Sequence, residues 1–246
     1  MDKKKIINIY IIIVTIITVL AIVVGVCRIF RIGNSIFSLG KSSSASETVK
    51  LKEFEKINLD MNVCDVNIKI GDDYELIYVF NGVASEDYAP KSEVKDGTLY
   101  ITQKDEKKSS LFKSSKSCDI TISVPSGVNL KNIEIKTNVG DLNIDAICCK
   151  ETTINSHVGD VDIKNVTGDL IELTADVGDV GIKKCEFDTI SVTSNVGDVK
   201  LKDTICNVVS VDSSIGDVAV ENVLDASGNK PQMDINTEIG DKKGDD

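Results

Sequence analysis

Residues 158–180 read VGDVDIKNVTGDLIELTADVGDV, and this stretch contains the unit that organises the chain. A Gly-Asp pair recurs every 19 residues, with its glycine at Gly140, Gly159, Gly178, Gly197 and Gly216. A sixth pair begins at Gly240 after 24 residues, which indicates five inserted residues within 225–232. A fixed period of this length is typical of proteins built from stacked structural repeats.

Around each glycine, apolar residues alternate with polar ones, as in strands that bury one face. In the unit of Gly178, the apolar positions are Ile171, Leu173, Val177, Val180 and Ile182. The alternation skips one position across Val-Gly-Asp-Val, and we interpret the skip as a corner whose flanking apolar side chains both stay inside. Gly supplies a positive φ at no steric cost, and Asp bonds its own turn backbone. The inward column predicted directly before the glycines is Val139, Val158, Val177, Val196, Ile215 and Ile239.

A second apolar set, seven to nine residues after each glycine, closes the coil. Its members are Ile147, Cys149, Val166, Cys185, Phe187, Cys206 and Val223. The pattern predicts an all-β fold, a single-stack β-solenoid whose 19-residue coils pair in parallel about 4.8 Å apart. We expect no helix beyond an N-terminal anchor. These columns also predict that Asp at Val177 or Ile182 places an unpaired charge in the core.

The array has a degenerate first coil and an inserted segment at its N-terminal end. Ile57, Leu59, Met61, Val63, Val66 and Ile68 occupy the same columns, with Cys64-Asp65 at the Gly-Asp position. Three strand-like runs follow, at Tyr74–Phe80, Thr98–Thr102 and Cys118–Val124, and we expect them to cap the open end. The predicted domains are 51–132 for the first coil with its capping strands and 133–246 for the solenoid.

The N-terminal segment predicts a membrane anchor. Residues 6–27 form an uncharged, mostly branched apolar run of 22 positions, long enough to span a bilayer as a helix. Residues 1–5 are then a short cytoplasmic tail, and 28–50 a stalk. The alternatives are a processed signal peptide and a lipoprotein modified at Cys27. The lysines at 3–5 favour a cytoplasmic N-terminus and an extracellular C-terminal domain.

Composition excludes several function classes. The net charge is −11, and residues 32–246 alone carry 23 basic and 38 acidic side chains, net −15. Such a body repels nucleic-acid phosphates. His157 is the single histidine, and the chain has no Trp. Since other coils hold Asn, Asp, Ser or Glu in its column, His157 is interpreted as an outward polar residue and not as part of a triad with Ser156 and Asp160.

The run Cys118–Pro125, the following Leu130–Ile135 and the Val-Gly-Asp-Val repeats resemble the bacterial domain of unknown function 4097. This family is labelled adhesin-like and is related to LiaG-type envelope proteins. The resemblance covers about residues 51–241. It implies a membrane-attached, surface-facing β-repeat domain without established enzymatic activity, and it supplies no catalytic residues.

The aspartates beside the glycines form the first candidate site. In a solenoid they would stack at about 4.8 Å, where like charges repel by about 0.9 kcal/mol per pair in water. Either each carboxylate accepts N–H bonds of its own turn, which we favour, or Ca²⁺ binds along the column. The column consists of Asp141, Asp160, Asp179, Asp198 and Asp217, with Asp65 and Asp241 as outliers.

The seven cysteines show neither an even count nor a CxxC motif, so we interpret them as buried thiols. An occasional bridge between Cys185 and Cys206, in adjacent coils, is the alternative. The loop Lys104–Ser117 holds five lysines around Leu111-Phe112 and is predicted to be solvated; contact with anionic wall polymer or lipid headgroups is its alternative function.

Three function classes remain. We favour a non-enzymatic, membrane-anchored surface module for adhesion, sensing or scaffolding, with an envelope protein or polysaccharide as partner and no cofactor. The second class is a membrane-associated β-helical polymer on the cytoplasmic side, which free thiols would suit. The third is a calcium-stabilised β-helix enzyme acting on polysaccharide, although no cleft of basic residues is visible in the sequence.

Overall fold

The computed structural model describes residues 45–81, 90–103 and 117–244, and all regular structure in these residues is β-strand. Within them, no helix has the length and apolar character needed to cross a membrane. Residues 1–44, which include the apolar run 6–27 and Cys27, lie outside the described residues. The anchor, its alternatives and the orientation therefore stay predictions.

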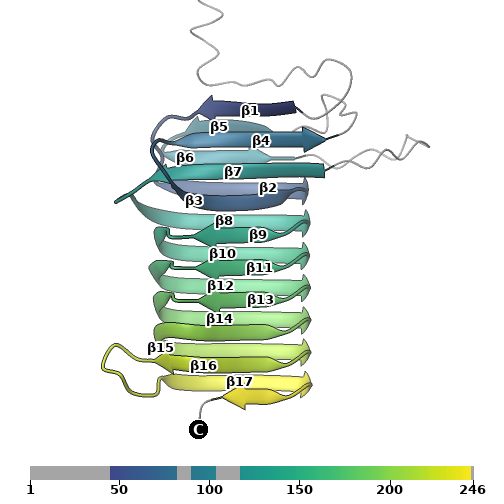
Figure 1. The fold of residues 1–246 in the computed structure, drawn as a ribbon, viewed down its shortest axis with the longest axis vertical. Coiled ribbons are helices and arrows are strands. Elements are labelled where there is room, and N and C mark those ends of the chain that lie inside the picture. Colours follow the sequence, from purple (N-terminus) through teal and green to yellow (C-terminus); the bar gives the residue numbers. More distant parts are fainter. Residues whose placement is uncertain (1–44, 82–89, 104–116, 245–246) are drawn as a thin grey trace, which may run out of the picture. The chain divides into compact units, whose positions relative to one another are not determined.

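Each coil of the solenoid contains one long and one short strand, and Figure 1 shows the coils stacked one below the next. Parallel pairing joins the long strands of neighbouring coils into one continuous face. These strands are β2 (Lys56–Val63), β8 (Asn129–Val139), β10 (Cys148–Val158), β12 (Thr167–Val177), β14 (Glu186–Val196), the second part of β15, and β17 (Gln232–Ile239). The whole of β15 spans Val199–Ile215 and contributes to both faces.

The short strands build the second face, again in parallel. They are β3 (Asp65–Gly71), β9 (Leu142–Asp145), β11 (Val161–Lys164), β13 (Val180–Lys183), the first part of β15, β16 (Val218–Leu224) and β18 (Lys242–Gly244). Ile171 pairs with Thr152 on one side and Ile190 on the other, a register of one 19-residue repeat. The predicted all-β solenoid is confirmed for the described residues.

Most of the predicted inward columns form the core. Ile171, Leu173, Val180 and Ile182 are all at most 2% exposed. The set that closes the coil is also buried, from Ile147 to Val223. Alternating strands on two facing sheets thus leave a single apolar interior between the faces.

The column directly before the glycines is exposed, so its predicted inward orientation is wrong. Val139, Val158, Val177, Val196 and Ile215 are 43–47% exposed, and Ile239 is 64% exposed. The inward side chain before the corner lies two positions earlier, at small residues such as Ser156, Ala175 and Ser194. Because the chain bends here, the four corner residues from two before the glycine to one after it lie outside the core, and a small side chain fills the narrow interior beside them.

A second corner, six residues after each glycine, was not predicted. Its backbone adopts a positive φ of 50–60° without glycine, at Ala146, Asn165, Lys184, Asp203 and Asn222. Three of these five are Asn or Asp, which tolerate this conformation better than other non-glycine residues. That recurrence was the available sequence signal. The corner also bonds between coils, since Asn165 donates its Nδ2 to Asp145 Oδ1 at 2.8 Å.

The N-terminal end carries the predicted first coil. Ile57 pairs with Ile133 and Leu59 with Ile135 in the expected columns. Inserted strands extend both faces beyond this coil: β4 (Glu75–Asn81), β6 (Thr98–Thr102) and β7 (Ser117–Pro125) match the three predicted runs. β6 pairs parallel to β2, β7 pairs parallel to β3, and β4 pairs antiparallel to β7.

Two edge strands at this end were missed. β1 (Ala45–Lys50) lies within the predicted stalk and pairs antiparallel to β4. β5 (Lys91–Lys95) pairs antiparallel to β6. Each contains few apolar residues, because an edge strand buries little, and neither shows the 19-residue pattern. Figure 1 places both at the end of the stack opposite β17.

Candidate functional site

The Gly-Asp corners of successive coils lie directly above one another and form one edge of the solenoid. The glycines adopt φ values of 139–151°, a region that L side chains avoid. Stacking adds a second restriction: a Cβ at Gly178 would lie 2.2 Å from the carbonyl oxygen of Gly159 in the preceding coil. The predicted structural role of these glycines therefore has two causes, backbone conformation and close approach of the coils.

Each corner aspartate bonds to the neighbouring coil. The Oδ1 atom of Asp160 accepts the backbone N–H of Asp179 at 2.8 Å, and the same contact repeats along the edge at 2.8–2.9 Å. The expected bond within the same turn is thus replaced by a bond between coils. We call this row the aspartate ladder; it comprises Asp65, Asp141, Asp160, Asp179, Asp198, Asp217 and Asp241.

The carboxyl groups near the two ends of the aspartate ladder have pKa values shifted in opposite directions. Asp217 uses Oδ1 for the N–H of Asp241 and Oδ2 for Lys243 Nζ at 3.0 Å. These two contacts, the backbone bond first, hold the pKa of Asp217 below its usual range. At the other end Asp119 pairs with Asp65, and burial followed by that neighbouring carboxyl raises the pKa of Asp119.

Beside the aspartate ladder, on the other side of the glycines, lies the exposed apolar column, which we call the valine ladder: Val139, Val158, Val177, Val196, Ile215 and Ile239. Parallel pairing aligns its members coil by coil. Polar residues precede it, and Asn195 Nδ2 bonds to Asp176 Oδ1 at 2.8 Å across coils. Sequence reasoning found this column but placed it inside.

His157 belongs to the outward polar column, as predicted. Its side chain is 62% exposed, and its Nε2 lies 3.9 Å from Asp176 Oδ2. Ser156 is buried and faces the core, so the structure does not bring Ser156, His157 and Asp160 together as a nucleophile, base and acid. Among the described residues, no group of three or more His, Cys, Asp or Glu side chains is arranged to hold a metal ion. Calcium binding stays an untested prediction.

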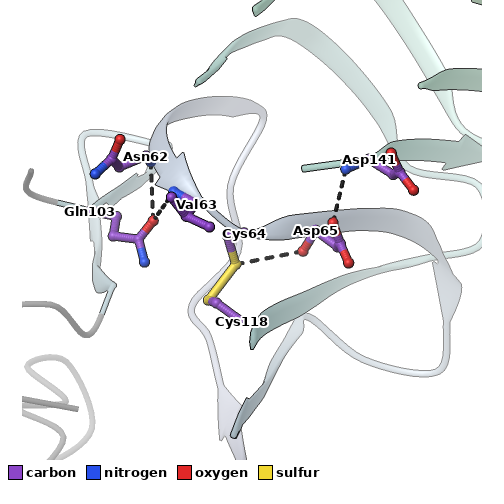
Figure 2. The surroundings of a disulfide bond; sticks show 7 residues. All are labelled: Asn62, Val63, Cys64, Asp65, Gln103, Cys118 and Asp141. Atoms are coloured by element: carbon purple, nitrogen blue, oxygen red, sulfur yellow. Dashed lines mark hydrogen bonds between the residues drawn. A yellow bond between two sulfur atoms is a disulfide. The ribbon is translucent and has the colours of Figure 1, made fainter. Parts of the chain in front are cut away.

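The first corner is built differently, as Figure 2 shows. Cys64 occupies the glycine position and forms a disulfide with Cys118, with 4.5 Å between the Cα atoms. The side chain of Gln103 lies beside this corner, and its Oε1 accepts the backbone N–H groups of Asn62 and Val63 at 3.0 and 2.8 Å. The inserted segment thus stabilises a corner that lacks glycine, through one disulfide and two hydrogen bonds.

The prediction that the cysteines form no disulfide is wrong for this pair. The β3–β7 pairing places Asp65 opposite Asp119, and the two cysteines therefore meet although 54 residues separate them. The alternative bridge between Cys185 and Cys206 is also wrong, because both are free thiols. Cys149, Cys185 and Cys206 are buried as expected, and burial raises the pKa of each, that of Cys149 to about 11. Such thiols are poor nucleophiles at neutral pH.

Of the predicted lysine-rich loop Lys104–Ser117, residues 104–116 lie outside the described residues. A smaller basic cluster lies on the second face, which the short strands build. There the carboxylate of Glu221 forms ion pairs with Lys200 Nζ and Lys202 Nζ, at 2.7 Å each. The two lysines hold the pKa of Glu221 at about 2. This cluster is internally paired, so the Gly-Asp edge is the stronger candidate for a binding surface.

Comparison with family models identifies the fold's relatives. Residues 54–242 match the model described as Toastrack DUF4097. The chain belongs to the Toastrack DUF4097 family. The match covers the first coil, the strands β4 to β7 and the repeat array as far as the start of β18, and it confirms the resemblance drawn from the sequence. A search of curated proteins finds no match.

Solved structures that are similar to this chain have low sequence identity to it. A suggested adhesin from Bacteroides fragilis is 20% identical, with a TM-score of 0.51, over 83% of this chain and 98% of that one. A suggested cell adhesion protein from Clostridium sporogenes is 16% identical, with a TM-score of 0.48, over 83% and 99%. A suggested adhesin from Parabacteroides merdae is 12% identical, with a TM-score of 0.45, over 84% and 98%.

The hydrogen bonds of the aspartate ladder lead to a test of its role. Changing Asp160, Asp179 and Asp198 together to Asn keeps the accepting oxygen and removes three stacked charges. We expect stability equal to the parent or slightly higher, whereas the triple Ala variant should lose about 1 kcal/mol per bond. Urea unfolding measures the difference.

The same variants test calcium. If the ladder carboxylates only bond between coils, millimolar Ca²⁺ should change the melting temperature no more than NaCl of equal ionic strength. A calcium-specific rise that disappears in the triple Asn variant would contradict this expectation and show that the column binds the ion.

Proposed function

We propose that this chain is a membrane-anchored, non-enzymatic binding module of the cell surface, acting in adhesion or in envelope sensing and scaffolding. The observation that carries the proposal is the continuous repeat array of a Toastrack domain, matched over residues 54–242. Stacked repeats present long, regular surfaces that suit proteins and polysaccharides. The related solved structures bear suggested adhesion roles, which agrees with a surface function.

Two features support the surface location. The uncharged run 6–27, preceded by the lysines at 3–5, has the pattern of a retained anchor with its N-terminus in the cytoplasm. The Cys64–Cys118 disulfide suits an oxidising compartment, since cytoplasmic proteins rarely keep such bonds. Both favour an extracellular domain over a cytoplasmic polymer.

A non-enzymatic role is supported by the chemistry of the side chains. Among the described residues, His157 is an exposed surface side chain beside Asp176, and the buried thiols have raised pKa values. The carboxylates of the aspartate ladder are engaged in bonds between coils. A binding surface needs no catalytic groups, whereas an enzyme needs a set of groups that converge on one substrate atom.

Protease shaving tests the location. In intact cells expressing the full chain, external protease should degrade the repeat domain, detected with an antibody against residues 51–246, while a cytoplasmic marker survives. The full-length chain should also stay with membranes after carbonate extraction. A domain that is protected in intact cells and cleaved only after lysis would favour the cytoplasmic polymer.

A further inference from the structure

The valine and aspartate ladders run side by side along the whole Gly-Asp edge. Each coil adds one exposed branched side chain and one carboxylate at a spacing of about 4.8 Å. A continuous apolar stripe on a soluble domain marks an interaction surface more often than scattered apolar residues do. In this structure five consecutive coils keep 43–47% of that apolar side chain exposed.

The aspartate ladder indicates the charge of what binds. Lys243 shows how an ammonium is accepted: its Nζ contacts Asp217 Oδ2 at 3.0 Å while Oδ1 still receives the N–H of Asp241 at 2.9 Å. A ladder carboxylate can therefore bind a cation and hold its coil at once. Within the described residues, Asp141, Asp160, Asp179 and Asp198 form no ion pair with a lysine or arginine.

We propose that this edge docks a cationic, amphipathic segment of a partner protein. Apolar side chains of that segment would cover the valine ladder, and its Lys or Arg groups would contact the Oδ2 atoms of the aspartate ladder as Lys243 does. The inference names a partner class for the proposed binding module and rests on that module binding proteins. It does not rest on membrane anchoring.

Charge and exposed apolar area together exclude the other candidate occupants of the edge. A second copy would bring the same carboxylates against each other, and the chain already carries a net charge of −11. Anionic lipid headgroups meet the same repulsion. A metal ion alone would use the carboxylates and leave the valine ladder exposed. A cationic amphipathic polypeptide is the class that satisfies both ladders.

The test measures peptide binding to the full-length protein in detergent micelles. The probe is a short fluorescent peptide in which Lys-Lys and Val-Val pairs alternate, so that each face of an extended segment presents both residue types. The comparison peptides replace Lys with Glu or Val with Ser. Two triple variants remove one ladder each: Val158, Val177 and Val196 to Thr, which keeps the branched shape, and Asp160, Asp179 and Asp198 to Asn, which keeps the bonds between coils. Melting curves confirm that each variant is folded.

We expect the Lys-Val peptide to bind the parent, and each triple variant to weaken that binding about tenfold, since the exposed ion pairs and the desolvated apolar stripe each contribute to affinity. The comparison peptides should bind weakly. The matched control changes Asp169, Glu172 and Asp188 to their amides, which removes three charges from exposed positions away from the edge. It should leave affinity within about twofold of the parent at physiological salt.

Three results would overturn the proposal. Equal losses in the control and the Asp160, Asp179 and Asp198 variant would reduce the effect to bulk charge. Unchanged binding in the Val-to-Thr variant would show that the valine ladder takes no part. Binding of anionic phospholipid vesicles, or self-association of the parent, that is lost in the same variants would assign the edge to a membrane or a second copy. Protection from protease in intact cells would contradict the proposed cell-surface location, but it would not affect the peptide-binding result.

Discussion

Changing Ile182 to Asp is expected to unfold the repeat array or to lower its stability by about 4 kcal/mol or more, because an unpaired carboxylate would lie in the apolar interior. Ile182 is fully buried between the two faces, with Ile163 and Leu201 as its neighbours above and below. Its charge would have no partner there, and the coil could not rotate it outward without breaking the parallel pairing on both sides.

Val177 provides the matched control, five residues earlier in the same coil. The same substitution there should cost less than about 1 kcal/mol, since this side chain is 47% exposed and meets only added repulsion from nearby carboxylates. Urea unfolding followed by circular dichroism measures both variants. Equal losses at the two positions would contradict the outward orientation of the valine ladder.

Changing Gly178 to Val is expected to have the second large effect, a loss of about 3 kcal/mol or more. The backbone there has φ of 140°, which a β-branched residue does not adopt without strain. The added Cβ would also lie 2.2 Å from the carbonyl oxygen of Gly159, so the two coils would have to separate. Because the contact begins at Cβ, Ala should be nearly as damaging as Val.

Gly228 separates these two causes. It has φ of 81° in the inserted turn, and a Cβ there would have no atom within 4 Å. Gly228 to Ala should therefore cost only the conformational strain, about 1–2 kcal/mol. If Gly178 to Ala costs no more than Gly228 to Ala in the same unfolding experiment, the close approach of the coils adds nothing, and the corner glycines are needed for φ alone.

The repeat made much of the fold readable from the sequence. Most positions that are apolar in coil after coil are buried, as Ile171 and Ile190 are, and the valine ladder is the exception. The recurring glycine marked a corner because few residues other than Gly adopt its conformation. The first coil and three inserted strands followed from the same columns and from apolar alternation.

The candidate site could be predicted only in part. The aspartate ladder was found by position, but its bonds run to the next coil and depend on how closely two corners stack. The disulfide between Cys64 and Cys118 depends on β7 lying against β3, a contact between segments that share no repeat. No local pattern encodes that distance.

The sequence by itself determined the period, the buried columns and the glycine corners, since each is a local property that six coils repeat. The tertiary structure alone decided that the valine ladder faces outward. Alternation assigns a side chain to a face only while the strand continues, and at a corner the chain turns by an amount that the pattern does not contain. The direction of Val177 is set by how the corner of Gly178 stacks on that of Gly159, a contact between residues 19 positions apart.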